Sequence, residues 1–191
     1  MIQEPYFTSD WHLDNRSSSR NCESRGYKFS VQMNNAIIDN VIATVPKGSI
    51  LYNMGDLSSK FTPEFLDPYL NRLWKAGIQM QWIYGNHDHK KNYHHRSIAW
   101  QGWQKVVKYD GQKIFLFHYP CHVWESSHYG AWSLFGHIHS GDATDTKMQK
   151  KGLTFPGKSY NVNIDMNDMK PLSFTQIKAI MNSKQDNWDK I

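Results

Sequence analysis

Five short apolar runs, each followed directly by Asp, Asn or His, are the feature that most limits how this sequence can fold. The five stretches are EPYFTSDWH, GSILYNMGD, IQMQWIYGNHD, QKIFLFHYP and AWSLFGHIH. Short apolar runs that end at turn residues are typical of buried β-strands. Because ligands gather at the carboxyl ends of the strands in α/β proteins, we predict five strands that carry polar side chains to one edge.

Two helix-like segments separate the first three predicted strands. In FSVQMNNAIIDNVIATVPKG, apolar residues recur at helical spacing, Ser30 is a possible N-cap, and Pro46 and Gly48 close the segment. TPEFLDPYLNRLWKAG carries a second apolar stripe and ends at Gly77, although Pro68 could instead mark its start. Farther along, KSYNVNIDMND alternates like a strand, and MKPLSFTQIKAIMNSK has the pattern of a turn and a short helix. This order of elements predicts an α/β fold built of layers.

The composition fits a single folded domain over residues 1–191. Aromatic residues make up 14% of the 191 residues, enough to build a sizeable core. The formal net charge of +5 fits anionic partners such as phosphate esters, but lysines that serve only solubility would give the same balance. Because no apolar run is long enough to cross a bilayer, we expect a cytoplasmic protein without a membrane partner.

Nine side chains at the ends of the predicted strands have the chemistry to bind a metal or to act in catalysis. They are Asp10, His12, Asp56, Asn86, His87, Asp88, His118, His137 and His139. Each alone has an ordinary explanation, such as a helix cap, a turn residue or a satisfied histidine. Unrelated residues would not each follow a separate apolar run, so we interpret the set as one site. On a strand, His137 and His139 would point to the same face while Ile138 points into the core.

These polar ends form an ordered series of motifs that resembles a known family. The motifs D-x-H, G-D, G-N-H-D, H and G-H-x-H stand in that order between Asp10 and His139. The series resembles the signature of the calcineurin-like metallophosphoesterases. The stretches RGYKFSVQMNNAII, FHYPCHVW and NVNIDMNDMKPLSFTQI also resemble the compact bacterial and phage-type branch of that family. The resemblance implies an α/β sandwich in which α-helices flank two mixed β-sheets.

The same resemblance implies a centre of two divalent metal ions about 3.5 Å apart. The implied ligands are one group of three, a second group of three and a bridging carboxylate: Asp10, His12 and His139; Asn86, His118 and His137; and Asp56. Mixed nitrogen and oxygen ligands suit Mn, our first choice, or Fe, Zn, Ni or Co better than Ca or Mg alone. Because most of these ligands are neutral, the centre stays positive, attracts a phosphate anion and keeps a bridging hydroxide ready as the nucleophile.

The third motif also has an implied catalytic role. By resemblance, His87 faces the substrate, where it stabilises the transition state or protonates the leaving oxygen, and Asp88 orients its ring. A neighbouring carboxylate favours the imidazolium, which is the form a general acid needs near pH 7. The alternative is a structural histidine beside the metal ligands.

Three arginines behind the first motif, Arg16, Arg20 and Arg25, are candidate substrate contacts, although a solvated loop would show the same charges. This Ser- and Arg-rich stretch departs from the family pattern.

We expect the protein to hydrolyse phosphate esters. Phosphodiesters such as cyclic or linear nucleotides are the first choice of substrate, and the candidate partner is a nucleotide or nucleic acid. The alternatives are a phosphomonoesterase acting on phosphoproteins or nucleotides, and a binding module that has lost the chemistry.

Overall fold

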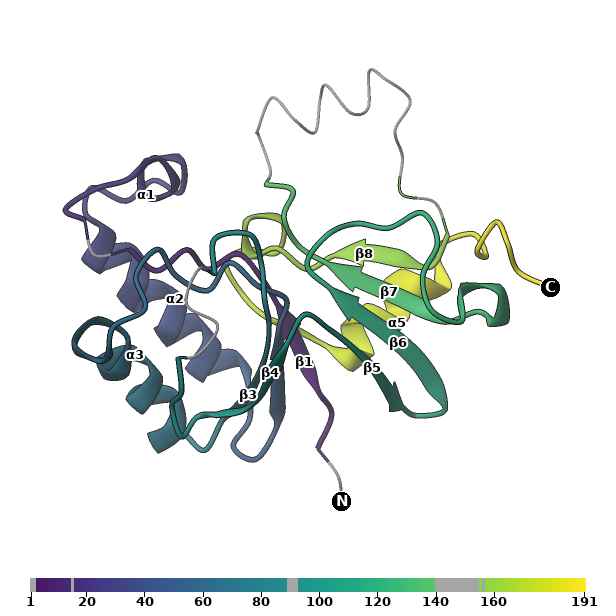
Figure 1. Ribbon diagram of the computed structural model, residues 1–191, viewed down its shortest axis with the longest axis horizontal. Helices are drawn as coiled ribbons and strands as arrows, with labels where there is room; N and C mark the ends of the chain where they lie inside the picture. Colours follow the sequence, from purple (N-terminus) through teal and green to yellow (C-terminus); the bar gives the residue numbers. More distant parts are fainter. Residues whose placement is uncertain (1–2, 15, 89–92, 140–154, 156) are drawn as a thin grey trace.

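Two stacked β-sheets form the centre of the computed structural model, which describes residues 3–14, 16–88, 93–139, 155 and 157–191 (Figure 1). The first sheet has the order β4-β3-β2-β1-β9 and the second the order β5-β6-β7-β8. The strands are β1 (Tyr6–Thr8), β2 (Ile50–Asn53), β3 (Gln79–Ile83), β4 (Ile98–Gly102), β5 (Gln104–Tyr109), β6 (Gln112–Phe117), β7 (Trp132–Phe135), β8 (Ser159–Asn161) and β9 (Leu172–Ser173). One pair in each sheet is antiparallel, β1 with β9 and β5 with β6, and the other pairs are parallel. Both sheets are therefore mixed, as the resemblance implied.

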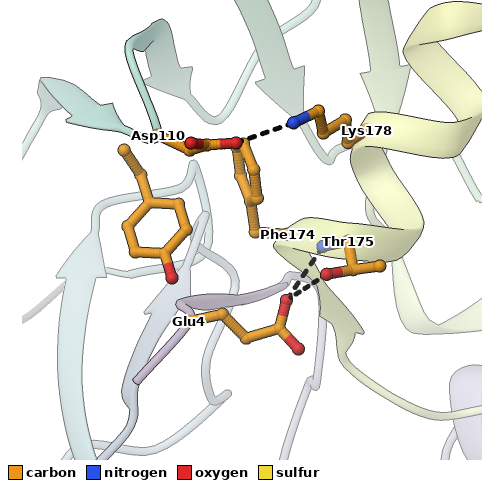
Figure 2. A pocket seen from close by; sticks show the side chains of 6 residues that line it. Glu4, Asp110, Phe174, Thr175 and Lys178 are labelled. Atoms are coloured by element: carbon orange, nitrogen blue, oxygen red, sulfur yellow. Dashed lines mark hydrogen bonds and ion pairs between the residues drawn. The ribbon is translucent and has the colours of Figure 1, made fainter. Parts of the chain in front are cut away.

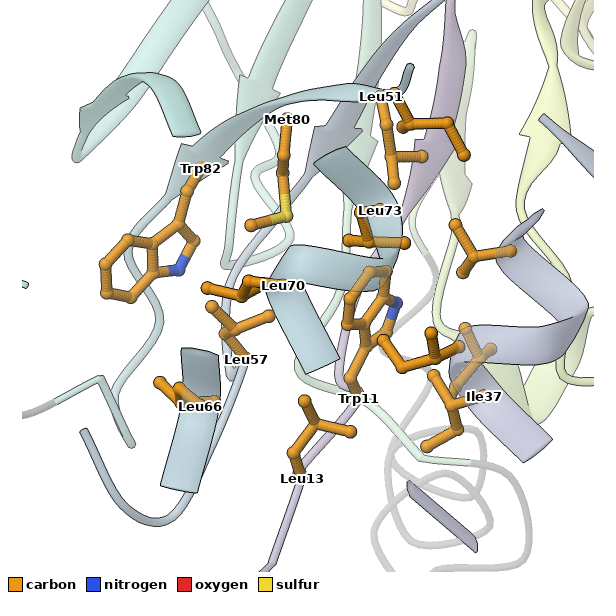
Figure 3. Packing of buried hydrophobic residues seen from close by; sticks show 14 of the residues in the cluster. Trp11, Leu13, Ile37, Leu51, Leu57, Leu66, Leu70, Leu73, Met80 and Trp82 are labelled. Atoms are coloured by element: carbon orange, nitrogen blue, oxygen red, sulfur yellow. The ribbon is translucent and has the colours of Figure 1, made fainter. Parts of the chain in front are cut away.

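Side chains of the first sheet alternate between two hydrophobic cores. Leu51 of β2 packs on one face against α2 (Ser30–Thr44) and α3 (Pro63–Lys75), as Figure 3 shows. Its neighbour Tyr52 packs on the other face, between the two sheets. Trp11, which lies between two candidate ligands, is fully buried in the first core (Figure 3). Burial of this indole anchors the loop that follows β1.

The two predicted helices form: α3 begins within the predicted TPEFL stretch and not at the alternative start Pro68, whereas the N-cap of α2 is one residue before the predicted Ser30. Ser30 is the first residue of α2, and the N-cap is Phe29, which makes no side-chain cap hydrogen bond. Pro68 lies inside α3, which begins at Pro63. A proline at the first position loses no hydrogen bond, and burial of the leucine stripe of α3 offsets the one lost at Pro68. Gly77 follows α3 with a φ of 74°, which confirms the predicted end.

The other helical elements within the described residues are α1 (Arg20–Ser24), η1 (Ser127–Tyr129), η2 (Ile164–Met166) and α5 (Phe174–Asn182). The last confirms the short helix expected near the end of the chain. In the described part of the chain, no helix is long and apolar enough to cross a membrane.

The sequence pattern predicts neither β4 nor β5, and it treats β9 as part of a turn. Each of β4 and β5 forms an edge of its sheet, and most of their residues are only partly buried. An edge strand is paired on one side, so it forms without the continuous apolar run that marks a central strand. The five predicted strands correspond to β1, β2, β3, β6 and β7.

A pocket of about 620 Å³, which none of the predicted ligands lines, lies between the residues before β1, the β5–β6 turn and the start of α5 (Figure 2). It is lined by Glu4, Tyr109, Asp110, Phe174, Thr175 and Lys178. The Lys178 ammonium pairs with Asp110 at 2.7 Å, and Glu4 accepts hydrogen bonds from the backbone N–H and the hydroxyl of Thr175. These contacts tie the start of the chain and the β5–β6 turn to α5.

Candidate metal centre

The loops after β1, β2, β3, β6 and β7 bring the predicted ligands together in two groups. The ligand atoms of Asp10, His12 and His139 all lie within 4.8 Å of one another. The same limit holds for Asp56, His118 and His137. We call these sets the first and the second ligand group. Two sheets contribute, because β1, β2 and β3 belong to one and β6 and β7 to the other.

The Asp56 carboxylate lies between the two groups. Its Oδ2 atom is 3.6 Å from His12 Nε2 and 3.5 Å from His118 Nε2. Its Oδ1 atom accepts a hydrogen bond of 2.8 Å from the backbone N–H of His87. One oxygen is thus held in place by the backbone while the other faces both groups, as a bridging ligand requires.

Asn86 adds an oxygen to the second group. Its Oδ1 atom is 2.9 Å from His118 Nε2 and 3.0 Å from His137 Nδ1. Ligand atoms bound about 2.1 Å from one metal ion are separated by roughly 3 Å, so this spacing fits a shared cation. The backbone carbonyl of Met54 accepts a hydrogen bond of 2.7 Å from His118 Nδ1, which leaves Nε2 with a lone pair toward the group.

Two glycines of the motifs allow the loops to approach closely. A Cβ atom on Gly85 would overlap the carboxylate and backbone N of Asp56. A Cβ atom on Gly136 would overlap the carboxylate of Asp10. The glycine that begins each of these two motifs is therefore needed for packing against a carboxylate from another loop.

Left-handed backbone conformations also shape the site. Asp10, His12, Asp56 and His137 have φ values of 60°, 47°, 52° and 70°. Such values cost free energy for residues other than glycine and cluster at functional sites.

The arrangement of the G-H-x-H motif corrects the prediction made for it. β7 ends at Phe135, so His137 and His139 lie on a loop and not on a strand. The backbone N–H of His137 donates to both oxygens of Asp10, and this bond holds the left-handed turn. The two imidazoles therefore enter different ligand groups, whereas Ile138 is buried as predicted.

The electrostatic environment of the first group fits a cation. Burial raises the pKa of Asp10 to about 7, partly offset by the nearby His139. Burial also lowers the pKa of His12, which keeps its imidazole neutral. A neutral imidazole is the form that binds a metal, and a cation is what keeps a buried carboxylate ionised. The donor set of both groups therefore fits divalent metal ions that bind nitrogen and oxygen ligands.

Asp88 occupies a different position from the one expected beside the His87 ring. Its carboxylate is buried and accepts hydrogen bonds from the backbone N–H groups of Gly85, Asp56 and Leu57 at 2.7, 2.9 and 3.0 Å. It thereby ties the loop after β3 to the loop that carries Asp56. His87 itself is exposed, and its ring centroid is 5.2 Å from that of His12.

The three arginines lie in different environments. Arg25 does not fit the expected substrate contact, because only 4% of its side chain is exposed and it pairs with Asp165 at 2.6 Å. Arg16 is exposed and pairs with Asp14, and Arg20 is exposed at the start of α1. Within the Ser- and Arg-rich stretch, Arg25 therefore makes a buried ion pair, whereas Arg16 and Arg20 lie at the surface.

Asp165 was missed by the sequence reasoning. Its Oδ2 atom is 2.5 Å from Nδ1 of His139. A residue that contacts a proposed ligand follows no spacing rule, and the stretch KSYNVNIDMND is predicted as a strand. The structure has a strand only at β8, and Asp165 lies in η2. The one signal that could have pointed to Asp165 is its place in NVNIDMNDMKPLSFTQI, a stretch that resembles the family.

The chain is similar to known proteins over nearly its whole length. Among solved structures, a protein of unknown function, AQ665, from Aquifex aeolicus has 20% identity and a TM-score of 0.70, covering 93% of this chain and 98% of that chain. The nuclease MPE from Pseudomonas putida has 16% identity and a TM-score of 0.41, covering 70% of this chain and 60% of that chain. Comparison with curated proteins gives no match. The family model described as calcineurin-like phosphoesterase matches residues 6–189, and the protein therefore belongs to that family.

Proposed function

We propose that this protein hydrolyses phosphate esters with two divalent metal ions, and that phosphodiesters such as cyclic or linear nucleotides are its preferred substrates. The observation that carries the proposal is the pair of ligand groups that face one oxygen of Asp56. Two bound divalent ions supply polarisation of the phosphoryl oxygens and a nucleophile derived from water at neutral pH.

The charge balance of the site supports an anionic substrate. Two dications bring four positive charges, and the carboxylates of Asp10 and Asp56 bring two negative charges. The other ligands are neutral imidazoles and the amide of Asn86, so the centre keeps a net positive charge.

We infer Mn as the first candidate metal, with Fe, Zn, Ni and Co as alternatives.

His87 is the proposed general acid. It is exposed beside His12, so its ring can reach a substrate without being part of either ligand group. Its backbone N–H is held by Asp56, and the next residue, Asp88, is held by the backbone of the same loop. These bonds fix the backbone on which the His87 imidazole is carried. We infer that Asp88 supports His87 in this way, through the backbone. Arg16 and Arg20 remain candidates for substrate contact.

A phosphomonoesterase and a binding module without chemistry are the alternatives. The experiment is to measure hydrolysis of bis(p-nitrophenyl) phosphate and p-nitrophenyl phosphate by metal-free protein, with and without added Mn²⁺. We expect Mn²⁺-dependent hydrolysis, faster for the diester. Faster monoester hydrolysis would favour a phosphatase, and no turnover of either substrate by protein that binds Mn²⁺ would favour a binding module.

A further inference from the structure

A buried ion pair stands behind His139 of the first ligand group. Arg25, at the end of α1, donates from Nε to Asp165 Oδ1 at 2.6 Å, and Asp165 Oδ2 lies 2.5 Å from His139 Nδ1. The side chains of Arg25 and Asp165 are 4% and 10% exposed. Since the Nδ1–H of His139 donates to this carboxylate, Nε2 presents its lone pair toward the ligand group.

The same guanidinium also holds the loop that carries the other two ligands of the first group. One terminal nitrogen of Arg25 donates to the carbonyl of Asp10 at 2.7 Å and the other to the carbonyl of Trp11 at 2.8 Å. Asp10 and His12 on either side of Trp11 have left-handed φ values, which persist only where surrounding contacts hold them. Arg25 and Asp165 together therefore support all three ligands of the first group.

The second group is supported differently in the described part of the chain. In the second group, His118 Nδ1 donates to the neutral backbone carbonyl of Met54, whereas in the first group His139 Nδ1 faces an ionised carboxylate. A hydrogen bond to an ionised carboxylate is stronger than one to a carbonyl, and it makes the imidazole a better electron donor. The two groups thus differ in the charge of the group that accepts the Nδ1–H hydrogen bond, a carboxylate for His139 and a neutral carbonyl for His118.

We propose that Asp165 and Arg25 are positioning residues that raise the affinity of the first ligand group for a divalent ion above that of the second. Asp165 acts through His139, and Arg25 acts by holding Asp165 and the loop from Asp10 to His12. The proposal rests on the metal pair of the proposed function, but it concerns metal binding and not turnover.

The test is Mn²⁺ binding to metal-free protein, followed by calorimetry and by the electron paramagnetic resonance signal of bound Mn²⁺. Asp165→Asn keeps the shape of the side chain and removes its charge. We expect a 10- to 100-fold loss of affinity for one of the two ions, the usual effect of losing such a partner. Asp110→Asn, which breaks the distant pair with Lys178, is the matched control and is expected to bind both ions as the wild type does.

A double-mutant cycle separates positioning from a general structural effect. If Asp165 acts through His139, then Asp165→Asn should not weaken binding further in a His139→Ala background, whereas independent effects would add. In a His137→Ala background the full loss should persist, because the first group is intact there. Melting of the metal-free variants checks that each is folded.

Two results would overturn the inference. One is a folded Asp165→Asn protein that binds both ions with wild-type affinity, and the other is additive losses in the His139→Ala background. Failure of the proposed function is a different result: a wild-type protein that binds two Mn²⁺ ions but hydrolyses neither ester leaves the inference standing.

Discussion

Asp56 is the proposed bridging ligand, since one of its oxygens lies within 3.6 Å of both His12 Nε2 and His118 Nε2. Asp56→Asn keeps the size of the side chain but removes the negative charge that faces His12 and His118. We expect loss of turnover and metal binding weakened beyond the roughly 10- to 100-fold that loss of a ligand's partner costs. Metal content by atomic emission and kcat at saturating Mn²⁺ check this. Near-normal activity at saturating Mn²⁺ would contradict the bridging role.

His87 is tested through the leaving group. An alkoxide such as a ribose oxygen must be protonated as it departs, whereas a nitrophenolate leaves almost unaided. His87→Ala is therefore expected to lose about 10²- to 10⁴-fold in kcat on a nucleotide ester, the usual scale of general acid catalysis, and clearly less on a nitrophenyl ester.

The control for this variant is its metal content, which should stay at two ions. Equal losses on both esters with the metals retained would favour electrostatic stabilisation of the phosphoryl oxygens by His87. Loss of metal would instead place His87 among the ligands.

At the scale of elements, the loops after the strands depend on close contact between backbones. Gly85→Ala places a methyl group against Asp56, and such overpacking costs about 1–3 kcal/mol. Because the displaced group is the bridging carboxylate, we expect weaker Mn²⁺ binding together with a lower Tm. Both are measured on the same sample by calorimetry.

Gly111→Ala is the comparison for that variant. Gly111 has a φ of 78° in the open β5–β6 turn, and a Cβ there meets nothing within 4 Å. Alanine at this position is strained by its φ alone, so stability should fall while Mn²⁺ binding is unchanged. If Gly85→Ala also left Mn²⁺ binding unchanged, the close approach would have no part in holding the site.

The elements also show which sequence patterns are informative. Central strands and helices with an apolar stripe are predictable from the sequence. A strand buried on both faces leaves a short apolar run, and a helix buried along one stripe leaves a helical period. The edge strands β4 and β5 show neither pattern, since each is paired on one side. Pro68 was ambiguous because the cost of a proline inside a helix depends on what the helix buries.

At the scale of the whole molecule, ions bound between loops of two sheets should stabilise the fold. An ion at 100 times its Kd contributes about 2.7 kcal/mol, which is roughly 5–10 °C in Tm for a chain of this size. Removal of metal with EDTA is expected to lower Tm by this amount for each ion, as measured by scanning calorimetry. The Asp56→Asn protein, which is expected to bind metal weakly, should show little change in Tm. The same Tm with and without EDTA in the wild type would mean that the ions do not link the two sheets.

The sequence by itself determined the ligand types and the strand ends that carry them, because an apolar run followed by Asp, Asn or His is a local pattern. Only the tertiary structure decided which polar residues enter the two ligand groups and which ones contact those residues from behind. Arg25 and Asp165 are 140 residues apart and meet behind His139, and the Asp88 carboxylate braces the loop of Asp56. Such partners satisfy buried charges and backbone groups wherever the fold brings them together, and that condition leaves no spacing in the sequence.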